Sequence, residues 1–241
     1  MRATGLGLAA LVAVVLAGCG PRTAPVSVPP SPSAAAPVTA ASPAGAPSSS
    51  PPPTFGGTAR PATAADVPHS WHPGCPVGPD QLSLLRLSYW GFDDRPHTGT
   101  MVVHRSVADQ VVRIFGMLYR ERFPIRRMQP VDVYGGSDPD SMADDNTSGF
   151  NCRYAVASGP PKWSAHAYGK AIDVNTVENP YLFGTQVLPP AGRAYLDRSK
   201  YRPGMALPGG LLVTAFAALG WKWGGATTSS PDYQHFSTSG G

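Results

Sequence analysis

The sequence has few cysteines, few lysines and no basic block. Only Cys19, Cys75 and Cys152 are cysteines among the 241 residues, and no CxxC pair occurs, which disfavours a zinc ribbon. Fifteen arginines and four lysines are spread along the chain, so the net charge of +4 gives no support to nucleic-acid binding. No internal repeat is visible either. One domain is therefore the default expectation for the folded part.

The N-terminus has the features of an export signal rather than of a membrane-spanning helix. A single charge, Arg2, precedes the apolar residues 6–17, which are too few to cross a hydrocarbon layer about 30 Å thick. The run ends in Leu-Ala-Gly-Cys at residues 16–19, which resembles the bacterial lipobox. We therefore expect a signal peptide over residues 1–18 and a lipid on Cys19 that holds the protein on the outer face of a bacterial membrane. The alternative is a secretory signal with an incidental cysteine.

A tether and a globular part follow the signal. Residues 19–68 are mostly Pro, Ala, Ser, Thr and Gly, a composition that cannot bury enough surface to offset chain entropy, so we expect them to be disordered. An extended chain of this length reaches on the order of 100 Å, which would place the domain within the cell wall. The alternative is an inert spacer that has no need to reach the wall, which would have the same composition. Residues 69–241 have the composition of one compact domain, which we expect to be monomeric.

The globular part carries both helix and strand signals. A capping box at residues 106–109, followed by apolar residues at helical spacing, predicts a helix that ends before Pro124. A second, buried helix is predicted over residues 210–219 because this stretch is apolar on nearly every face. Strand-like stretches lie at residues 100–104, 130–134, 170–175 and 233–237. Their irregular spacing favours an α+β domain with a small, mostly antiparallel sheet and packed helices.

Two cysteines remain if lipid occupies Cys19. Outside the cytoplasm disulfides persist, so we expect Cys75 and Cys152 to be bridged. Two buried free thiols are the competing interpretation, because separation along the sequence says nothing about the distance between the Cβ atoms.

Two polar segments carry the candidate chemistry. In the predicted strand over residues 170–175, alternation points Asp173 away from its apolar neighbours, and a preceding loop can fold His166 back beside it. Near the C-terminus, His235 and Asp232 are three residues apart. A catalytic zinc ion needs three protein ligands and an open position for water, and the remaining carboxylate can take the proton of that water. Taken singly, each residue also has a structural explanation as a core histidine or a turn carboxylate.

Several motifs together resemble one family. A Ser-x-His-x-x-Gly-x-Ala-x-Asp frame covers residues 164–173, and an Asp-x-x-His motif covers residues 232–235. Residues 141–153 and 74–77 also look like segments of that family. The domain thus resembles the M15 zinc D,D-peptidases, which include VanY- and VanX-type D-Ala-D-Ala peptidases and phage L-alanyl-D-glutamate endopeptidases. Residues 226–230 depart from the pattern, because small polar side chains stand where an aromatic residue is common.

The resemblance implies a VanX/VanY-like fold and a role for each residue of the site. The implied zinc ligands are His166, Asp173 and His235, the acid/base is Asp232, the arginine that steadies the scissile carbonyl is Arg153, and the substrate contacts are Ser164 and Tyr168. Zn²⁺ would be the cofactor, and a peptidoglycan stem peptide the substrate.

Two questions stay open at this point. The same metal core serves cleavage before a terminal D-Ala and cleavage of L-Ala-D-Glu, and only the former needs a cation for a free carboxylate, which Arg126, Arg127 or Lys170 could supply. The second question is whether the protein is an enzyme or a non-catalytic, zinc-containing wall-binding lipoprotein. The presence of Asp232 as a base favours the enzyme.

Overall fold

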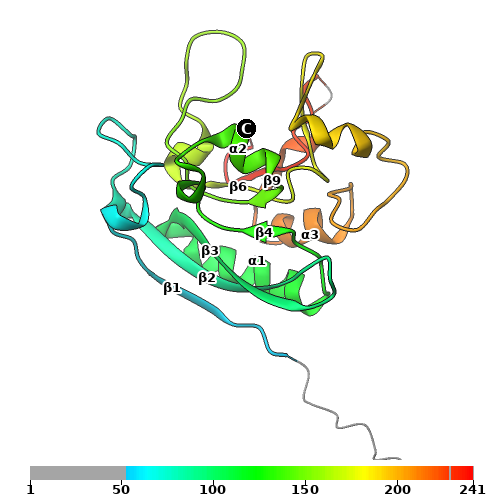
Figure 1. Cartoon of the computed structure of the whole chain (residues 1–241), viewed down its shortest axis with the longest axis horizontal. Helices are drawn as coiled ribbons and strands as arrows, with labels where there is room; N and C mark the ends of the chain where they lie inside the picture. Colours follow the sequence, from blue (N-terminus) through cyan, green and yellow to red (C-terminus); the bar gives the residue numbers. More distant parts are fainter. Residues whose placement is uncertain (1–52, 228, 241) are drawn as a thin grey trace, which may run out of the picture. The chain divides into compact units, whose positions relative to one another are not determined.

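The computed structural model describes residues 53–227 and 229–240, which combine helices with small sheets (Figure 1). This arrangement confirms the expected α+β class. The strands are β1 Gly57–Pro61, β2 Leu82–Trp90, β3 Pro96–His104, β4 Arg127–Met128, β5 Asn146–Thr147, β6 Ala171–Asp173, β7 Tyr181–Phe183, β8 Gln186–Leu188, β9 Lys222–Trp223 and β10 His235–Ser237. The α-helices are α1 Ala108–Arg120, α2 Asp138–Ala143 and α3 Leu211–Ala217. The 3₁₀ helices are η1 Ala64–Asp66, η2 Pro79–Gln81, η3 Arg105–Val107, η4 Val131–Tyr134, η5 Ala165–Tyr168, η6 Pro190–Tyr195 and η7 Gly224–Ala226.

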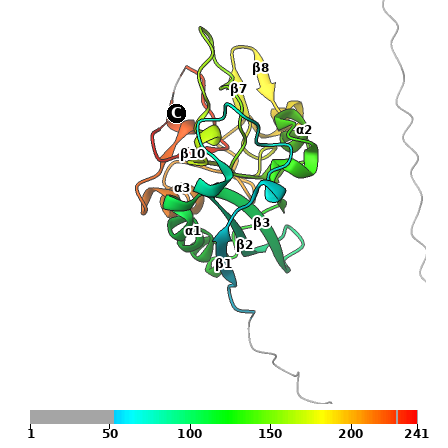
Figure 2. The same cartoon turned by 90° about the vertical axis from the view of Figure 1, so that its left-hand side faces the viewer.

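The first sheet is antiparallel in the order β1-β2-β3, and α1 lies across one of its faces (Figure 2). Within the β2–β3 hairpin, Leu85 stands opposite Met101 and Leu84 opposite Val102. Because side chains alternate along a strand, the first pair packs in the main core with α1, and the second pair packs in a smaller cluster on the other face. The hairpin therefore separates two apolar clusters.

Helix α1 presents one apolar stripe to this sheet. Its residues Val111, Phe115 and Leu118 recur at helical spacing and are at most 1% exposed, which confirms the predicted helix. The predicted capping box is wrong. Ser106 lies in the preceding turn η3, where its hydroxyl bonds to the imidazole of His104 at 2.7 Å instead of capping the helix.

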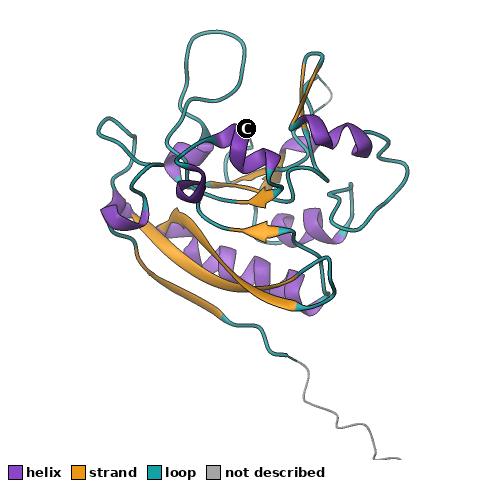
Figure 3. Ribbon diagram, in the orientation of Figure 1, coloured by secondary structure: helices purple, strands orange, loops and turns teal. Residues whose placement is uncertain are grey.

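The second sheet, in the order β6-β10-β9, brings the C-terminus back beside the centre of the chain. Strands β6 and β10 pair antiparallel, with Phe236 opposite Ile172 and His235 opposite Asp173. Phe236 and Ile172 are fully buried on the core side, where the rings of Phe236 and Phe216 stack at 4.2 Å. His235 and Asp173 consequently share the opposite face. Figure 3 shows that long loops surround this sheet.

Two element predictions need correction. The strand predicted over residues 130–134 is instead the 3₁₀ turn η4, Val131–Tyr134. Pro130 before it has no N–H for a ladder, and Gly135 follows with a φ of +62°. The helix over residues 210–219 exists as α3, but it is buried on one side only, and Leu211 is 37% exposed. Its C-terminal stop at Gly220, with a φ of +81°, agrees with the prediction.

The folded part begins earlier than the predicted boundary at residue 69. Strand β1 pairs with β2 over its whole length, and Ala62 and Val67 are buried at 6% and 0% exposure. An edge strand is held by backbone hydrogen bonds, which a composition poor in apolar side chains does not reveal. The predicted signal peptide, Cys19 and the tether up to residue 52 lie outside the described residues. Within the described part, no helix is both long and apolar enough to cross a membrane.

The expected pair Cys75 and Cys152 is joined by a disulfide. The bridge closes a loop of 77 residues and fixes the chain immediately before Arg153. Replacing both cysteines by Ala should lower the free energy of unfolding by about 2–4 kcal/mol, because the opened loop regains entropy in the unfolded chain. Thermal unfolding followed by circular dichroism measures this effect. Reductant should destabilise the wild type and leave the double variant unchanged, and equal midpoints for the two oxidised proteins would contradict the prediction.

Candidate metal centre

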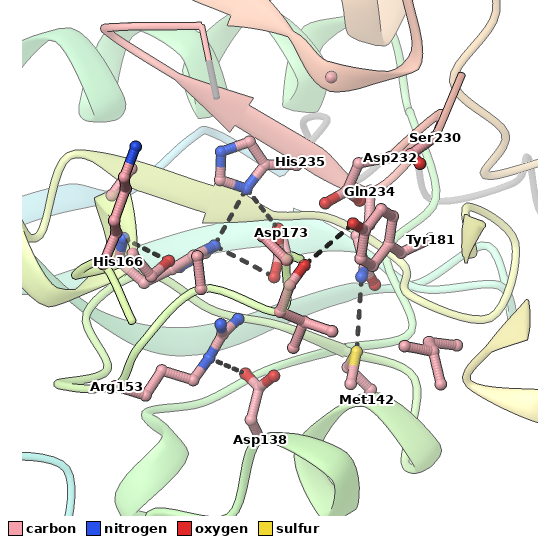
Figure 4. A pocket seen from close by; sticks show the side chains of 18 of the residues that line it. Asp138, Met142, Arg153, His166, Asp173, Tyr181, Ser230, Asp232, Gln234 and His235 are labelled. Carbon is pink, nitrogen blue, oxygen red and sulfur yellow. Dashed lines mark hydrogen bonds and ion pairs between the residues drawn. The ribbon is translucent and has the colours of Figure 1, made fainter. Parts of the chain in front are cut away.

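Three side chains meet on the open face of the second sheet. Asp173 ends β6, His235 begins β10, and the register of the two strands sets these residues opposite each other. His166 belongs to the turn η5 just before β6. All three are buried, with exposures of 2% for His166, 4% for Asp173 and 8% for His235. The structure thus brings together the three ligands expected from the sequence (Figure 4).

The spacing of the donor atoms suits a metal ion. His166 Nε2 is 3.1 Å from His235 Nδ1 and 3.2 Å from Asp173 Oδ2, and His235 Nδ1 is 3.2 Å from Asp173 Oδ1. In a tetrahedral zinc site with bonds of roughly 2.0–2.1 Å, neighbouring donor atoms are about 3.3 Å apart. Among the described residues, this group offers three protein ligands, which leaves a position open as in catalytic zinc sites.

A hydrogen bond to the ring nitrogen that faces away from the trio fixes the orientation of His166. Its Nδ1 lies 2.6 Å from the carbonyl oxygen of Gly149, which can only accept, so Nδ1 donates and Nε2 keeps its lone pair for a metal. The absence of a side chain at Gly149 lets its backbone lie against β3, because a Cβ there would lie 2.4 Å from the carbonyl oxygen of Val102. The ring of His166 is therefore held in the tautomer that a metal ligand requires.

The charges within the trio favour cation binding. Burial opposes the charged form of His166, but Asp173 outweighs it and raises the pKa of this imidazole. Burial likewise disfavours the ionised form of Asp173, yet the two imidazoles hold the pKa of this carboxyl well below its usual range. Asp173 is thus ionised and able to bind a cation.

The two predicted substrate contacts, Ser164 and Tyr168, lie differently with respect to the cavity. Ser164 is buried, lines the cavity described below, and accepts a hydrogen bond from the backbone N–H of His166 at 3.3 Å, so it also starts the turn η5. Tyr168 is 40% exposed and is not one of the described residues that line the cavity. Gly169, with a φ of +63°, reverses the chain directly after it, and the substrate contact through Tyr168 stays a prediction.

Asp232 faces the same space as the trio. Its Oδ1 is buried without a hydrogen-bond partner among the described residues. Burial, reinforced by the negative charge of Asp173, raises the pKa of Asp232 to about 7. The backbone N–H of Asp232 donates to the carbonyl of Gly224 at 3.2 Å, and a Cβ on Gly224 would come within 3.0 Å of the Asp232 Cβ. A carboxyl with this pKa can exchange a proton near neutral pH.

Arg153 reaches the cavity from the other side, where it has a partner that the sequence did not reveal. Its Nε lies 2.8 Å from Asp138 Oδ1, and both side chains are mostly buried (Figure 4). Asp138 opens α2, whose N-cap Ser137 accepts from a backbone N–H in the first turn. The only sequence signal for Asp138 was its place behind a helix-capping serine, which does not indicate a functional role.

These side chains line one cavity of about 330 Å³. The residues expected from the sequence that line it are Arg153, Ser164, His166, Asp173, Asp232 and His235. Sequence reasoning missed others that also line it, namely Asp138, Lys162, Trp163, Tyr181 and Gln234.

None of the three cations suggested for a substrate carboxylate lines this cavity, which corrects that expectation. Arg126 is paired with Asp145 at 3.4 Å, and Arg127 is paired with Asp144 at 2.9 Å. Lys170 does not line the cavity either.

A second group with suitable donor types, His72 with Cys75 and Cys152, does not form a metal site in this structure. The two sulfur atoms are consumed by the disulfide, and metals bind the thiolate.

A buried His-Asp-His trio beside a carboxyl of raised pKa is the kind of site that suits hydrolysis by metal-activated water. Comparison with protein families agrees with this class. Residues 158–238 match the model of a peptidase family M15 group described as D-alanyl-D-alanine carboxypeptidase. The matched segment contains the trio and Asp232 but begins after Arg153. No curated protein and no solved structure matches the chain. The match covers less than half of the chain and supports a peptidase of the M15 type.

Proposed function

We propose that the protein is a zinc-dependent peptidase that hydrolyses peptidoglycan stem peptides, of the D-Ala-D-Ala carboxypeptidase or L-Ala-D-Glu endopeptidase type. One observation carries the proposal. The buried trio of His166, Asp173 and His235 lines the same cavity as Asp232, whose Oδ1 has no partner among the described residues. A structural role explains neither the close approach of two imidazole nitrogens nor a buried carboxyl oxygen without a donor.

Zinc is the metal that best fits two imidazoles, one carboxylate and an open fourth position. When bound, it would lower the pKa of a water molecule and polarise the carbonyl of the substrate. The role of this chain is to direct one ring nitrogen of His166 and one of His235 to the same point. The hydrogen bond from His166 Nδ1 to Gly149 serves this role.

Asp232 moves the proton in the proposed reaction. As a carboxylate it takes a proton from the attacking water, and as a carboxylic acid it gives that proton to the amine that leaves. Both forms are accessible near neutral pH because burial raises the pKa of Asp232 to about 7. The antiparallel bridge between Asp232 and Tyr181 and the hydrogen bond to Gly224 hold the carboxyl in place.

Arg153 stabilises the negative charge that develops on the oxygen of the attacked carbonyl, and Asp138 positions its guanidinium. Replacing Arg153 by Ala should lower kcat by about 10²–10³-fold, in line with the loss of one oxyanion donor. Asp138→Asn should lower kcat less, because the guanidinium remains but is less well held. The exposed Arg113 on α1 offers the control, and Arg113→Ala should keep wild-type kinetics. An Arg153→Ala enzyme with unchanged kcat would remove this residue from the mechanism.

The location of the protein belongs to the same proposal. The signal sequence and the Leu-Ala-Gly-Cys motif favour export and a lipid on Cys19. A tether between this lipid and the domain would let the cavity reach stem peptides while the protein stays on the outer face of the membrane.

The test incubates the purified full chain with muropeptides of defined stem length, with and without a chelator, and identifies the products by mass. We expect loss of a terminal D-Ala or a cut at L-Ala-D-Glu, which the chelator stops and added zinc restores. If zinc binds the trio but no stem peptide is cut under any condition, the protein is a wall-binding module and the peptidase proposal fails.

A further inference from the structure

The cavity wall carries one cation that the proposed chemistry does not use. Besides the imidazoles, its charged residues are the carboxyls Asp138, Asp173 and Asp232 and the cations Arg153 and Lys162. Arg153 is paired with Asp138, and Asp173 is paired with the imidazoles of the trio. Lys162 has no ion-pair partner within residues 53–227 and 229–240.

The backbone at Lys162 is held in place relative to Arg153. Its carbonyl accepts from the backbone N–H of Ala155 at 2.9 Å, and the adjacent rings of Tyr154 and Trp163 stack at 4.4 Å between centroids. The N–H of Ser164 donates to the carbonyl of Arg153 at 3.1 Å. Lys162 therefore stands at the neck of a loop whose two arms are tied together.

One arm of this loop is also fastened across the cavity. Tyr181, on β7, donates its hydroxyl proton to the carbonyl oxygen of Val156 at 3.0 Å, and both residues line the cavity. The loop that carries Lys162 is exposed, but its arms form part of the cavity wall.

Charge balance indicates what Lys162 would bind. A divalent cation in the trio, together with Arg153, balances the charges of Asp138, Asp173 and ionised Asp232. The ammonium of Lys162 is then the uncompensated charge in the cavity. Its natural complement is a ligand with a single negative charge, and a carboxylate forms strong charge-assisted hydrogen bonds with an ammonium group.

We propose that Lys162 binds the free C-terminal carboxylate of the substrate and thereby makes this site a carboxypeptidase. The inference rests on the peptidase function proposed above and chooses between its two types. A peptide bond inside a chain offers no charge at this point, whereas a terminal dipeptide does. A cavity of about 330 Å³ lies at the lower end of the range for small-molecule sites and suits such a short segment.

The kinetic test compares an acyl-D-Ala-D-Ala peptide with its C-terminal amide. The wild type should prefer the free acid, and Lys162→Ala should raise KM for the acid by about ten-fold while leaving KM for the amide unchanged. Lys162→Arg should keep most of the preference. Lys200→Ala removes the same charge at an exposed site outside the cavity and should change neither substrate.

A binding experiment separates this inference from the proposed catalysis. The zinc-loaded Asp232→Asn variant is titrated with both peptides by calorimetry, with Lys162 intact and with Lys162→Ala added. We expect tighter binding of the acid only when Lys162 is present. Equal affinity for acid and amide with Lys162 intact, or a preference that survives Lys162→Ala, would overturn the inference. Absence of chelator-sensitive cleavage by the wild type would instead count against the peptidase function, and the binding result would still decide the role of Lys162.

Discussion

Replacing Asp232 by Asn should lower kcat by about 10²–10⁴-fold, the usual contribution of a general acid/base. The amide is close in shape to the carboxyl but can neither take nor return the proton. Since Asp232 is not one of the trio, the variant should bind zinc as the wild type does. Steady-state kinetics together with the zinc content of the dialysed protein measure both effects.

Asp109, exposed in the first turn of α1, provides the matched control, because Asp109→Asn makes the same chemical change away from the cavity. This variant should retain wild-type turnover. An Asp232→Asn enzyme that holds zinc and turns over at the full rate would refute the proposed base.

The pH dependence of kcat/KM should report the same residue. The base must be ionised to accept a proton, so activity is present above its pKa and falls as the pH drops through it. Burial raises the pKa of Asp232 to about 7, and a cation in the trio opposes this shift, so the acid limb should lie at or below pH 7. The limb should be absent in Asp232→Asn. A profile with the same acid limb in that variant would assign the limb to another group.

Asp173→Ala should weaken zinc binding by more than about 100-fold, because the loss of a partner behind a ligand already costs 10–100-fold. The carboxylate is the only anionic member of the trio, and its removal leaves two buried imidazoles facing one another at 3.1 Å. Competition with a chromophoric chelator measures the affinity, and the activity at limiting zinc should fall to background.

The Asp109→Asn protein serves as the control for this experiment as well, since its trio is intact. Unchanged zinc affinity in Asp173→Ala would show that the metal lies elsewhere. Circular dichroism would show whether a loss of affinity comes from unfolding. In that case Asp173→Asn, which preserves the size of the side chain, replaces Asp173→Ala in the binding experiment.

The sequence could predict the trio because its parts are local. Alternation along β6 separates Asp173 from the core residue Ile172, and the turn η5 places His166 just before the strand. His235 is 62 positions from Asp173 in the sequence, and its membership of the same site followed only from the resemblance of the motifs. Physical reasoning alone gave two pairs of candidate residues without their register.

Interactions between distant segments account for what was missed. The partner of Arg153, Asp138, comes from a short helix and shares no spacing signal with it. Strand β1 is an edge strand held by its backbone, and its sequence Gly-Thr-Ala-Arg-Pro has no large apolar side chain that would distinguish it from a tether. The cation at the cavity was expected near the trio in sequence or on a basic pair, whereas Lys162 arrives on a loop that the Tyr154–Trp163 stack closes.

The most direct test of the metal centre is anomalous X-ray diffraction from crystals of the zinc-loaded protein, recorded above and below the zinc absorption edge. The structure predicts one strong peak within about 2.0–2.2 Å of His166 Nε2, His235 Nδ1 and an oxygen of Asp173. A peak at any other group of residues, or none between these three in crystals that contain zinc, would contradict the account.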